Sequence, residues 1–203
     1  NQHSPIRDQY PNGHVFSLEQ LIKYAVSESD GTASDVLMRI AGGADVIQKY
    51  VENLGIPEMK IKNTEKEIGE DWSVQYDNWA SPEGAAALLK SLWGQKEPCP
   101  KGADCEELLL LQFMYNSTPG KNRLKGLLPE RTPVAHKTGT SGTRAGVTAA
   151  TNDIGIITLP NGNHLAIAVF VGDSSADEKT REVVIARIAK AAWNRWGATS
   201  VLK

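Results

Sequence analysis

The sequence lacks several features that would each indicate a class of function. Its 203 residues carry a formal net charge of −2, so it has no basic excess to hold a nucleic-acid backbone. No apolar run approaches the ~20 residues of a membrane-spanning helix. No G-x-G-x-x-G motif follows an expected strand, and low-complexity tracts are missing. We therefore expect a globular protein with no nucleic-acid partner, no membrane partner and no dinucleotide cofactor.

Cysteine is scarce. Cys99 and Cys105 are the only two, and they flank a short stretch that contains proline and glycine. A zinc site usually needs four ligands, and the four histidines are scattered along the chain, so we expect no metal. The pair is either a local disulfide, which would indicate an oxidising compartment, or two free thiols. The sequence leaves both readings open.

Helical periodicity dominates the first two thirds of the chain. Ser17 and Gln20 form a capping-box pattern, and apolar residues follow at helical spacing. A polar segment over residues 58–78 interrupts the pattern, and a loop of that length is uncommon unless it is functional. The expected helices cover residues 17–26, 32–41, 44–54, 81–93 and 106–116.

The sequence pattern changes from helical to strand-like after Pro129. Three strands are expected, with a hairpin turn at 160–163 and a closing helix over 177–196. Helices and strands are segregated, which favours an α+β fold. The expected strands cover residues 133–142, 153–158 and 164–171. We divide the chain into an N-terminal loop (1–16), a helical domain with its long polar loop (17–130) and a part with strands and a closing helix (131–203).

Three short motifs whose side chains are suited to catalysis occur in a fixed order. Ser29-Asp30-Gly31 lies between two expected helices, Glu65 follows in the polar loop, and Lys137-Thr138-Gly139 lies on the first strand. Each motif alone has an ordinary explanation. A Ser-Asp pair caps helices, a loop glutamate is a solvated charge, and a lysine before a glycine suits a strand edge. The combination in this order favours a shared function.

These motifs resemble those of serine β-lactamases of class A, and in particular the PER-type extended-spectrum branch. The resemblance extends from about Ser4 to Trp193. It implies a β-lactamase/transpeptidase-like fold, with a helical domain beside an antiparallel sheet flanked by helices. It also implies hydrolysis of penicillins and cephalosporins through an acyl-enzyme, without a cofactor, in the periplasm or outside the cell, and hence antibiotic resistance. The matching stretches are 29–35, 74–79, 123–129, 136–142 and 148–153.

The resemblance also implies catalytic roles. Ser29 passes a proton to the lactam nitrogen, because a hydroxyl both donates and accepts. Lys137 holds Ser29 in place and attracts the substrate carboxylate. Glu65 is the general base that activates water for deacylation.

Substrate-binding roles follow from the same resemblance. Arg123 lies where PER-type enzymes place a carboxylate-facing guanidinium, although a surface arginine is the alternative. The Thr140 backbone N–H resembles half of an oxyanion hole. The remaining residues expected to bind the substrate or line its path are Gly31, Thr138, Gly139 and Ser141, together with the side chain of Thr140.

Two glycines depart from the family pattern. Gly31 replaces the usual asparagine of S-D-N, so an amide that would contact the substrate is absent. Gly69 lies four residues after Glu65, where most of the family has an asparagine that holds the deacylation water. We expect slow release of the acyl-enzyme, unless the loop backbone substitutes for that asparagine.

The family's nucleophile motif, S-x-x-K, occurs once, at Ser200–Lys203, where no chain follows to form its helix. The match indicates a frayed end, or else a rearranged chain. The chain also starts at Asn1 with no signal-like segment. We therefore expect a truncated C-terminal portion that is inactive alone and that a complementing N-terminal segment would complete. The alternatives are a non-catalytic lactamase-like binding module and a penicillin-binding, transpeptidase-like protein, which would lack the Glu65 base.

Overall fold

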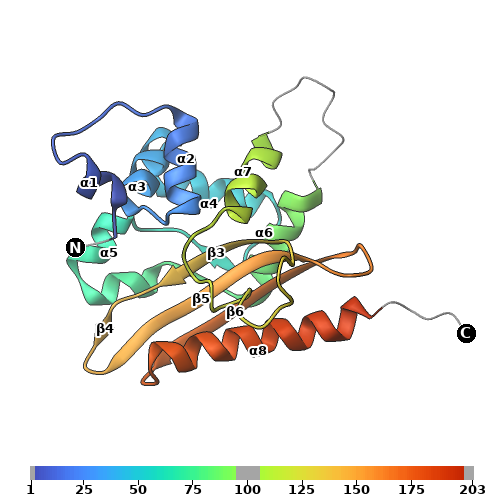
Figure 1. Ribbon diagram of the computed structural model, residues 1–203. Coiled ribbons are helices and arrows are strands. Elements are labelled where there is room, and N and C mark those ends of the chain that lie inside the picture. Colours follow the sequence, from blue (N-terminus) through green and yellow to red (C-terminus); the bar gives the residue numbers. More distant parts are fainter. Residues whose placement is uncertain (1–2, 95–105, 199–203) are drawn as a thin grey trace, which may run out of the picture. The chain divides into compact units, whose positions relative to one another are not determined.

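The computed structural model describes residues 3–94 and 106–198, which form two compact units (Figure 1). The first unit runs up to Phe113, and the second begins at Met114. The cysteine pair, Cys99 and Cys105, and the S-x-x-K match at Ser200–Lys203 lie outside the described residues.

The first unit is built on helices that begin and end at the signals seen in the sequence. Ser17 accepts a hydrogen bond from the Gln20 N–H, and the Gln20 side chain accepts one from the Ser17 N–H, which confirms the capping box. Gly42 and Gly43 end the next helix with φ of 101° and 97°. The helices are α1 (Pro5–Gln9), α2 (Leu18–Ser27), α3 (Gly31–Ile40), α4 (Ala44–Asn53), α6 (Pro82–Gly94) and α7 (Glu106–Tyr115), which continues past the boundary. None of the helices in the described ranges is long and apolar enough to cross a membrane.

The predicted N-terminal loop contains helix α1, so that part of the prediction is wrong. Ser4 caps this helix and Pro5 occupies its first turn, where a missing N–H costs nothing. Five residues are too few to show an apolar period, which is why the sequence pattern missed it. Ile6 packs in one cluster with Leu21 and Ala33, so the segment belongs to the core of the first unit.

The polar segment 58–78 is also more ordered than predicted. Near its start, β1 (Met59–Lys60) pairs antiparallel with β2 (Trp79–Ala80), which directly follows the segment. Between the two strands lie α5 (Glu65–Glu70) and the 3₁₀ helix η1 (Trp72–Asp77). The Asn78 side chain closes the loop: its Oδ1 accepts from the N–H groups of Lys62 and Asn63, and its Nδ2 donates to the Asn63 carbonyl. The segment is a compact loop with hydrogen-bonded ends.

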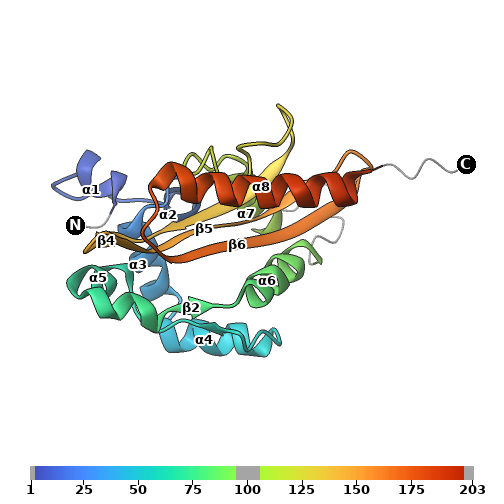
Figure 2. The same ribbon diagram turned by 90° about the horizontal axis from the view of Figure 1, so that it is seen from below.

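The second unit is an antiparallel sheet covered by one long helix. Its strands are β3 (Val134–Thr140), β4 (Thr143–Arg144), β5 (Val147–Thr158) and β6 (His164–Ser174). β5 is central, because β3 and β4 pair with it along one edge and β6 along the other. Helix α8 (Glu178–Gly197) runs along one face of this sheet (Figures 1 and 2). The predicted hairpin and closing helix are confirmed, whereas the small residues 147–152 hid the first half of β5.

The core of the second unit explains where the chain divides. Leu124, Ile157 and Ile185 have no exposed surface and pack together between sheet and helix. Leu124 comes from the segment before β3, which the sequence assigned to the helical domain. Because its side chain fills the sheet core, the division falls between Phe113 and Met114 rather than between residues 130 and 131.

Replacing Leu124 with alanine should destabilise the second unit by about 3 kcal/mol, because a fully buried leucine leaves a cavity that the sheet cannot fill. Leu127→Ala is the matched control, since this neighbouring leucine is 47% exposed. Urea unfolding followed by tryptophan fluorescence measures both. Equal effects of the two variants would contradict the assignment of Leu124 to the core.

Candidate active site

The Ser29-Asp30-Gly31 motif is anchored by its aspartate. Asp30 is 1% exposed, and its carboxylate accepts hydrogen bonds from the N–H groups of Ala33 (2.8 Å) and Ile6 (2.7 Å) and from the Ser4 hydroxyl. Asp30 therefore caps α3, which is the ordinary explanation for such a pair. The same carboxylate also ties α1 to the start of α3, so the position of Ser29 beside it is fixed.

Ser29 has an unusual backbone conformation. Its φ is +56°, in the left-handed region that serine rarely adopts. The loop holds it there because the Tyr24 carbonyl accepts from both Glu28 N–H and Asp30 N–H. His3 contacts the next turn, since its carbonyl accepts from Gly31 N–H at 3.0 Å. A strained residue held from both sides is typical of a functional position.

Glu65 is the first residue of α5, and α3 fixes its place. The N–H groups of Glu65 and Lys66 donate to the two carboxylate oxygens of Asp35, at 2.7 and 2.9 Å. Thr64 and Glu67 complete the helix start as a capping box. The Thr64 N–H and hydroxyl hold the pKa of Glu67 below its usual value. Asp35, which sequence reasoning missed, is therefore the residue that positions the backbone of Glu65.

The two glycine departures lie on one groove. Gly31 and Gly69 line a cavity of about 390 Å³ along α3 and α5, together with Asp35 and Lys66. Neither position carries the amide that most of the family would place there. The polar side chains that line the groove beside Gly69 are those of Lys66 and Glu70.

The Lys137-Thr138-Gly139 motif lies on β3 in the second unit, as predicted. The Lys137 ammonium donates to the Thr138 carbonyl at 2.8 Å. The Thr138 side chain is only 7% exposed, and its methyl group faces Gly120, where a β-carbon would lie 2.3 Å away. The side chain of Thr138 thus packs inside the unit. The Thr138 side chain is therefore not available to a substrate carboxylate, and only other groups of the strand could bind one there.

Thr140 and Ser141 end the strand in different environments. Thr140 is exposed. The Ser141 Oγ accepts from Ala150 N–H at 2.8 Å and donates to the Gly142 carbonyl at 3.0 Å. The Ser141 hydroxyl therefore ties β3 to β5 at the start of the β4 hairpin, and Thr140 presents the more accessible hydroxyl.

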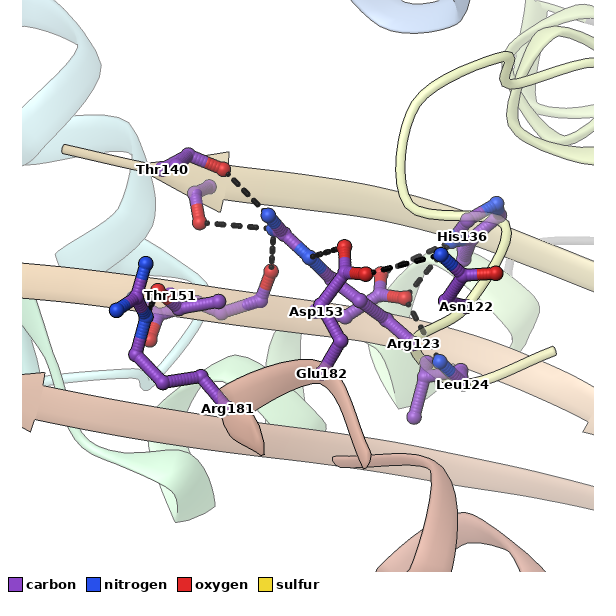
Figure 3. A network of polar contacts seen from close by, with 11 residues as sticks. Asn122, Arg123, Leu124, His136, Thr140, Thr151, Asp153, Arg181 and Glu182 are labelled. Carbon is purple, nitrogen blue, oxygen red and sulfur yellow. Dashed lines mark hydrogen bonds and ion pairs between the residues drawn. The ribbon is translucent and has the colours of Figure 1, made fainter. Parts of the chain in front are cut away.

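Arg123 is buried in the second unit, where its guanidinium contacts protein oxygens (Figure 3). Its side chain is 4% exposed, so it is not a surface arginine. Its Nε pairs with Glu182 Oε1 at 3.2 Å, and its Nη1 donates to the carbonyls of Gly139 and Asn152. Its Nη2 donates to Thr140 Oγ1 at 2.8 Å. The guanidinium is committed to protein acceptors, because burying it without them would be costly.

A second buried pair lies on the same face of the sheet. His136 Nδ1 contacts the Asp153 carboxylate at 2.9 Å, and both residues are fully buried. Because successive strand residues alternate, His136 and its neighbour Lys137 point to opposite faces of the sheet. Gly155 makes room for it, because a β-carbon there would lie 2.9 Å from His136 Cβ. Asp153 also accepts from Leu124 N–H at 3.1 Å.

Burial and charge act in opposite directions on Lys125, which follows in the same segment. Burial lowers the pKa of its ammonium, whereas the Asp153 charge raises it, and the net direction is downward.

The structure therefore distributes the predicted residues over the two units. Ser29, Gly31 and Glu65 belong to the first, and Arg123 and residues 137–141 to the second. Sequence reasoning missed the carboxylates that fix them. Asp153 gave a usable signal, because a charged residue inside a buried apolar strand needs a partner. Glu182 gave no such signal, because in the sequence it looks like any other charged residue on an amphipathic helix. Over the described ranges, no three His, Cys, Asp or Glu side chains are grouped so as to hold a metal.

Comparison with known proteins identifies the family. Residues 2–196 match the family described as "Beta-lactamase enzyme family". The chain belongs to this family. It is 42% identical to β-lactamase VEB-1 and 44% identical to extended-spectrum β-lactamase PER-1, both from Pseudomonas aeruginosa, over 94% and 95% of its length. The match covers 63% and 62% of the lengths of those two proteins. The chain therefore spans less than two thirds of the length of these curated relatives.

The fold comparison agrees with this membership. The crystal structure of TLA-3 extended-spectrum β-lactamase matches with a TM-score of 0.91 at 44% identity, over 98% of this chain and 71% of that one. The architecture is thus that of class A β-lactamases, as the resemblance implied.

Asp35→Ala should loosen the start of α5 by about 1–3 kcal/mol, because two backbone N–H groups lose their acceptors. Amide hydrogen exchange at Glu65 and Lys66 measures this loss. Asp45→Ala, an exposed aspartate in the first turn of α4, is the control and should leave both amides unchanged. Unaltered protection in Asp35→Ala would show that α5 is held by other contacts.

Proposed function

We propose that this chain carries active-site residues of a serine β-lactamase that hydrolyses the β-lactam ring of penicillins and cephalosporins through an acyl-enzyme. The observation that carries the proposal is the ordered set of Ser29, Glu65 and Lys137 in a chain of the β-lactamase family. The relatives VEB-1, PER-1 and TLA-3, which are named as β-lactamases, support it.

Each residue has a chemical task in this proposal. Ser29 relays a proton to the departing lactam nitrogen, because its hydroxyl donates and accepts. Lys137 supplies a positive charge that attracts a substrate carboxylate. Glu65 takes a proton from the water that attacks the acyl-enzyme. Gly31, Gly139, Thr140 and Ser141 line the substrate path, with the Thr140 N–H as one oxyanion donor, whereas the Thr138 side chain packs inside the second unit.

The nucleophile comes from a complementing segment in this proposal. A serine nucleophile of the S-x-x-K type needs a lysine one helical turn later on the same face. The only such spacing in the sequence is Ser200–Lys203. We place the protein in the periplasm or outside the cell and infer a role in antibiotic resistance, because cell-wall antibiotics act there.

A non-catalytic lactamase-like module is the second candidate. Gly31 and Gly69 favour it, because both remove amides from the groove beside α5. A transpeptidase-like enzyme is less well supported, because a transpeptidase does not need a base such as Glu65 to activate water.

A chromogenic cephalosporin separates the candidates. The chain alone should give no turnover, and turnover should appear when a separately expressed N-terminal segment of PER-1 that carries S-x-x-K is added. Intact mass under denaturing conditions establishes that no second polypeptide was present at the start. Steady hydrolysis by the chain alone would overturn the assignment of the nucleophile, and no hydrolysis by the complemented protein would favour the binding module.

Glu65→Gln in the complemented protein should trap the acyl-enzyme, because an amide cannot take the proton from water. Mass spectrometry should show the protein increased in mass by one opened lactam, while steady turnover falls by at least ~100-fold. Glu70→Gln, on the same short helix and exposed, is the matched control. Unchanged turnover in Glu65→Gln would remove the role given to this residue.

A further inference from the structure

Strand β6 forms one edge of the sheet in the second unit. It pairs with β5 from His164 to Ser174, and in the described ranges no strand pairs with its other side. An edge strand presents a row of backbone N–H and C=O groups to any strand that can reach it, so proteins often place a lysine, a proline or a bulge there. The opposite edge of this sheet follows that rule, because Lys137 lies on β3.

The middle of β6 carries no such protection. Residues 165–172 include no charged residue and no proline. Ile167 and Val169 belong to the core cluster under α8, so the strand is held firmly from one face. The ionisable side chains of β6, His164 and Asp173, lie near its two ends. An uncharged edge rich in β-branched residues is a template on which a second strand can pair.

Helix α8 has an apolar flank on the same side as this edge. Val184 and Ile188 lie one helical turn apart and are 42% and 45% exposed. They are on the side of α8 that is turned away from Glu182, which contacts Arg123 in the segment before β3. Because β3 and β6 are at opposite edges of the sheet, the flank with Val184 and Ile188 faces the open edge of β6.

Ile188 is level with the middle of the strand. The helix runs back along β6, since Gly197 near its end lies against Pro160, close to where β6 begins. The distance from the end of β6 back to Val169 is about 17 Å, which α8 covers in about eleven residues. Counted from the start of α8 at residue 178, that distance ends beside Ile188.

We propose that the edge of β6 and the flank of α8 dock a second copy of this chain, whose β6 pairs antiparallel with this one about a twofold axis at Val169. The axis brings the two Ile188 side chains together and places His164 of each copy near Asp173 of the other, so an imidazole and a carboxylate meet at each end. The dimer is closed, because both copies use the same edge. The inference goes beyond the proposed function, since it rests on the second unit and on no catalytic residue.

Sedimentation equilibrium of the chain tests the dimer directly. We expect a reversible equilibrium between monomer and dimer at protein concentrations between about 1 and 200 µM. Amide hydrogen exchange over the same range should slow with concentration at alternate residues of 165–172, whose N–H groups point away from β5. The amides of α4, in the first unit, are the internal reference and should exchange at the same rate throughout.

Ile188→Lys and Leu127→Lys form a matched pair of variants. Each replaces an apolar side chain of the second unit, 45% or 47% exposed, with a positive charge. Ile188→Lys should raise the dissociation constant of the dimer at least about tenfold, because two ammonium groups meet at the axis. Leu127→Lys, away from the β6 edge, should change it less than about twofold. Val184→Lys is the second variant, should Ile188→Lys fail to fold.

A mixture of Ile188→Lys and Ile188→Glu chains should associate more tightly than either variant alone, because opposite charges then meet at the axis. A chain that stays monomeric at about 200 µM would overturn the inference and leave the edge of β6 to a strand of another polypeptide. Dimers with unchanged exchange in β6, equal effects of the two lysine variants, or open-ended aggregates would also overturn it. Loss of both affinity and β6 protection in Ile188→Lys would support it.

Discussion

Burial of the Arg123 guanidinium is the constraint on which the second unit depends. A permanently charged group with five N–H donors lies almost fully inside the protein, so oxygens must surround it. They come from β3, β5 and α8, through Gly139, Asn152 and Glu182. The same requirement therefore joins the long helix to the strand that carries the K-T-G motif. Removing one partner of such a pair costs about 3–5 kcal/mol, whereas the intact pair contributes far less.

In the first unit, hydrogen bonds of polar side chains hold the loop that carries Glu65. The loop that carries Glu65 has no buried side chain on α5 or η1, so apolar packing does not fix it. Asn78 closes its ends and Asp35 holds its helix start. Hydrogen bonds with defined directions orient a residue more sharply than hydrophobic contact does, because hydrophobic burial has no preferred direction. The proton transfer proposed for Glu65 would benefit from that precision.

The parts of this structure that follow from the sequence are those with a local or periodic cause. The capping box at Ser17 and Gln20, the glycine stop after α3 and the hairpin before β6 each rest on a few adjacent residues. Helix α1 and the loop helices were missed because five or six residues are too few to show a repeating apolar pattern. The first half of β5 was missed because small residues form it. The burial of Arg123 against Glu182 was not predicted, because the two residues lie 59 positions apart and Glu182 has no distinguishing pattern.

The candidate site divides in the same way. Family motifs located Ser29, Glu65 and Lys137, and the capping role of Asp30 was among the readings weighed. The groups that orient these residues come from distant segments, and neither a spacing rule nor a propensity predicts which carboxylate meets which donor. Such pairings become visible only when the fold brings the segments together.

The left-handed backbone of Ser29 limits which amino acids this position accepts. Threonine carries the same hydroxyl and would serve proton transfer equally well in solution. Its branched β-carbon, however, is poorly tolerated at a φ of +56°, where serine already lies outside its preferred region. The backbone conformation of the loop between α2 and α3 thus favours serine over threonine, although both side chains carry a hydroxyl. If the proposed proton relay needs a hydroxyl here, serine meets that need and threonine does not.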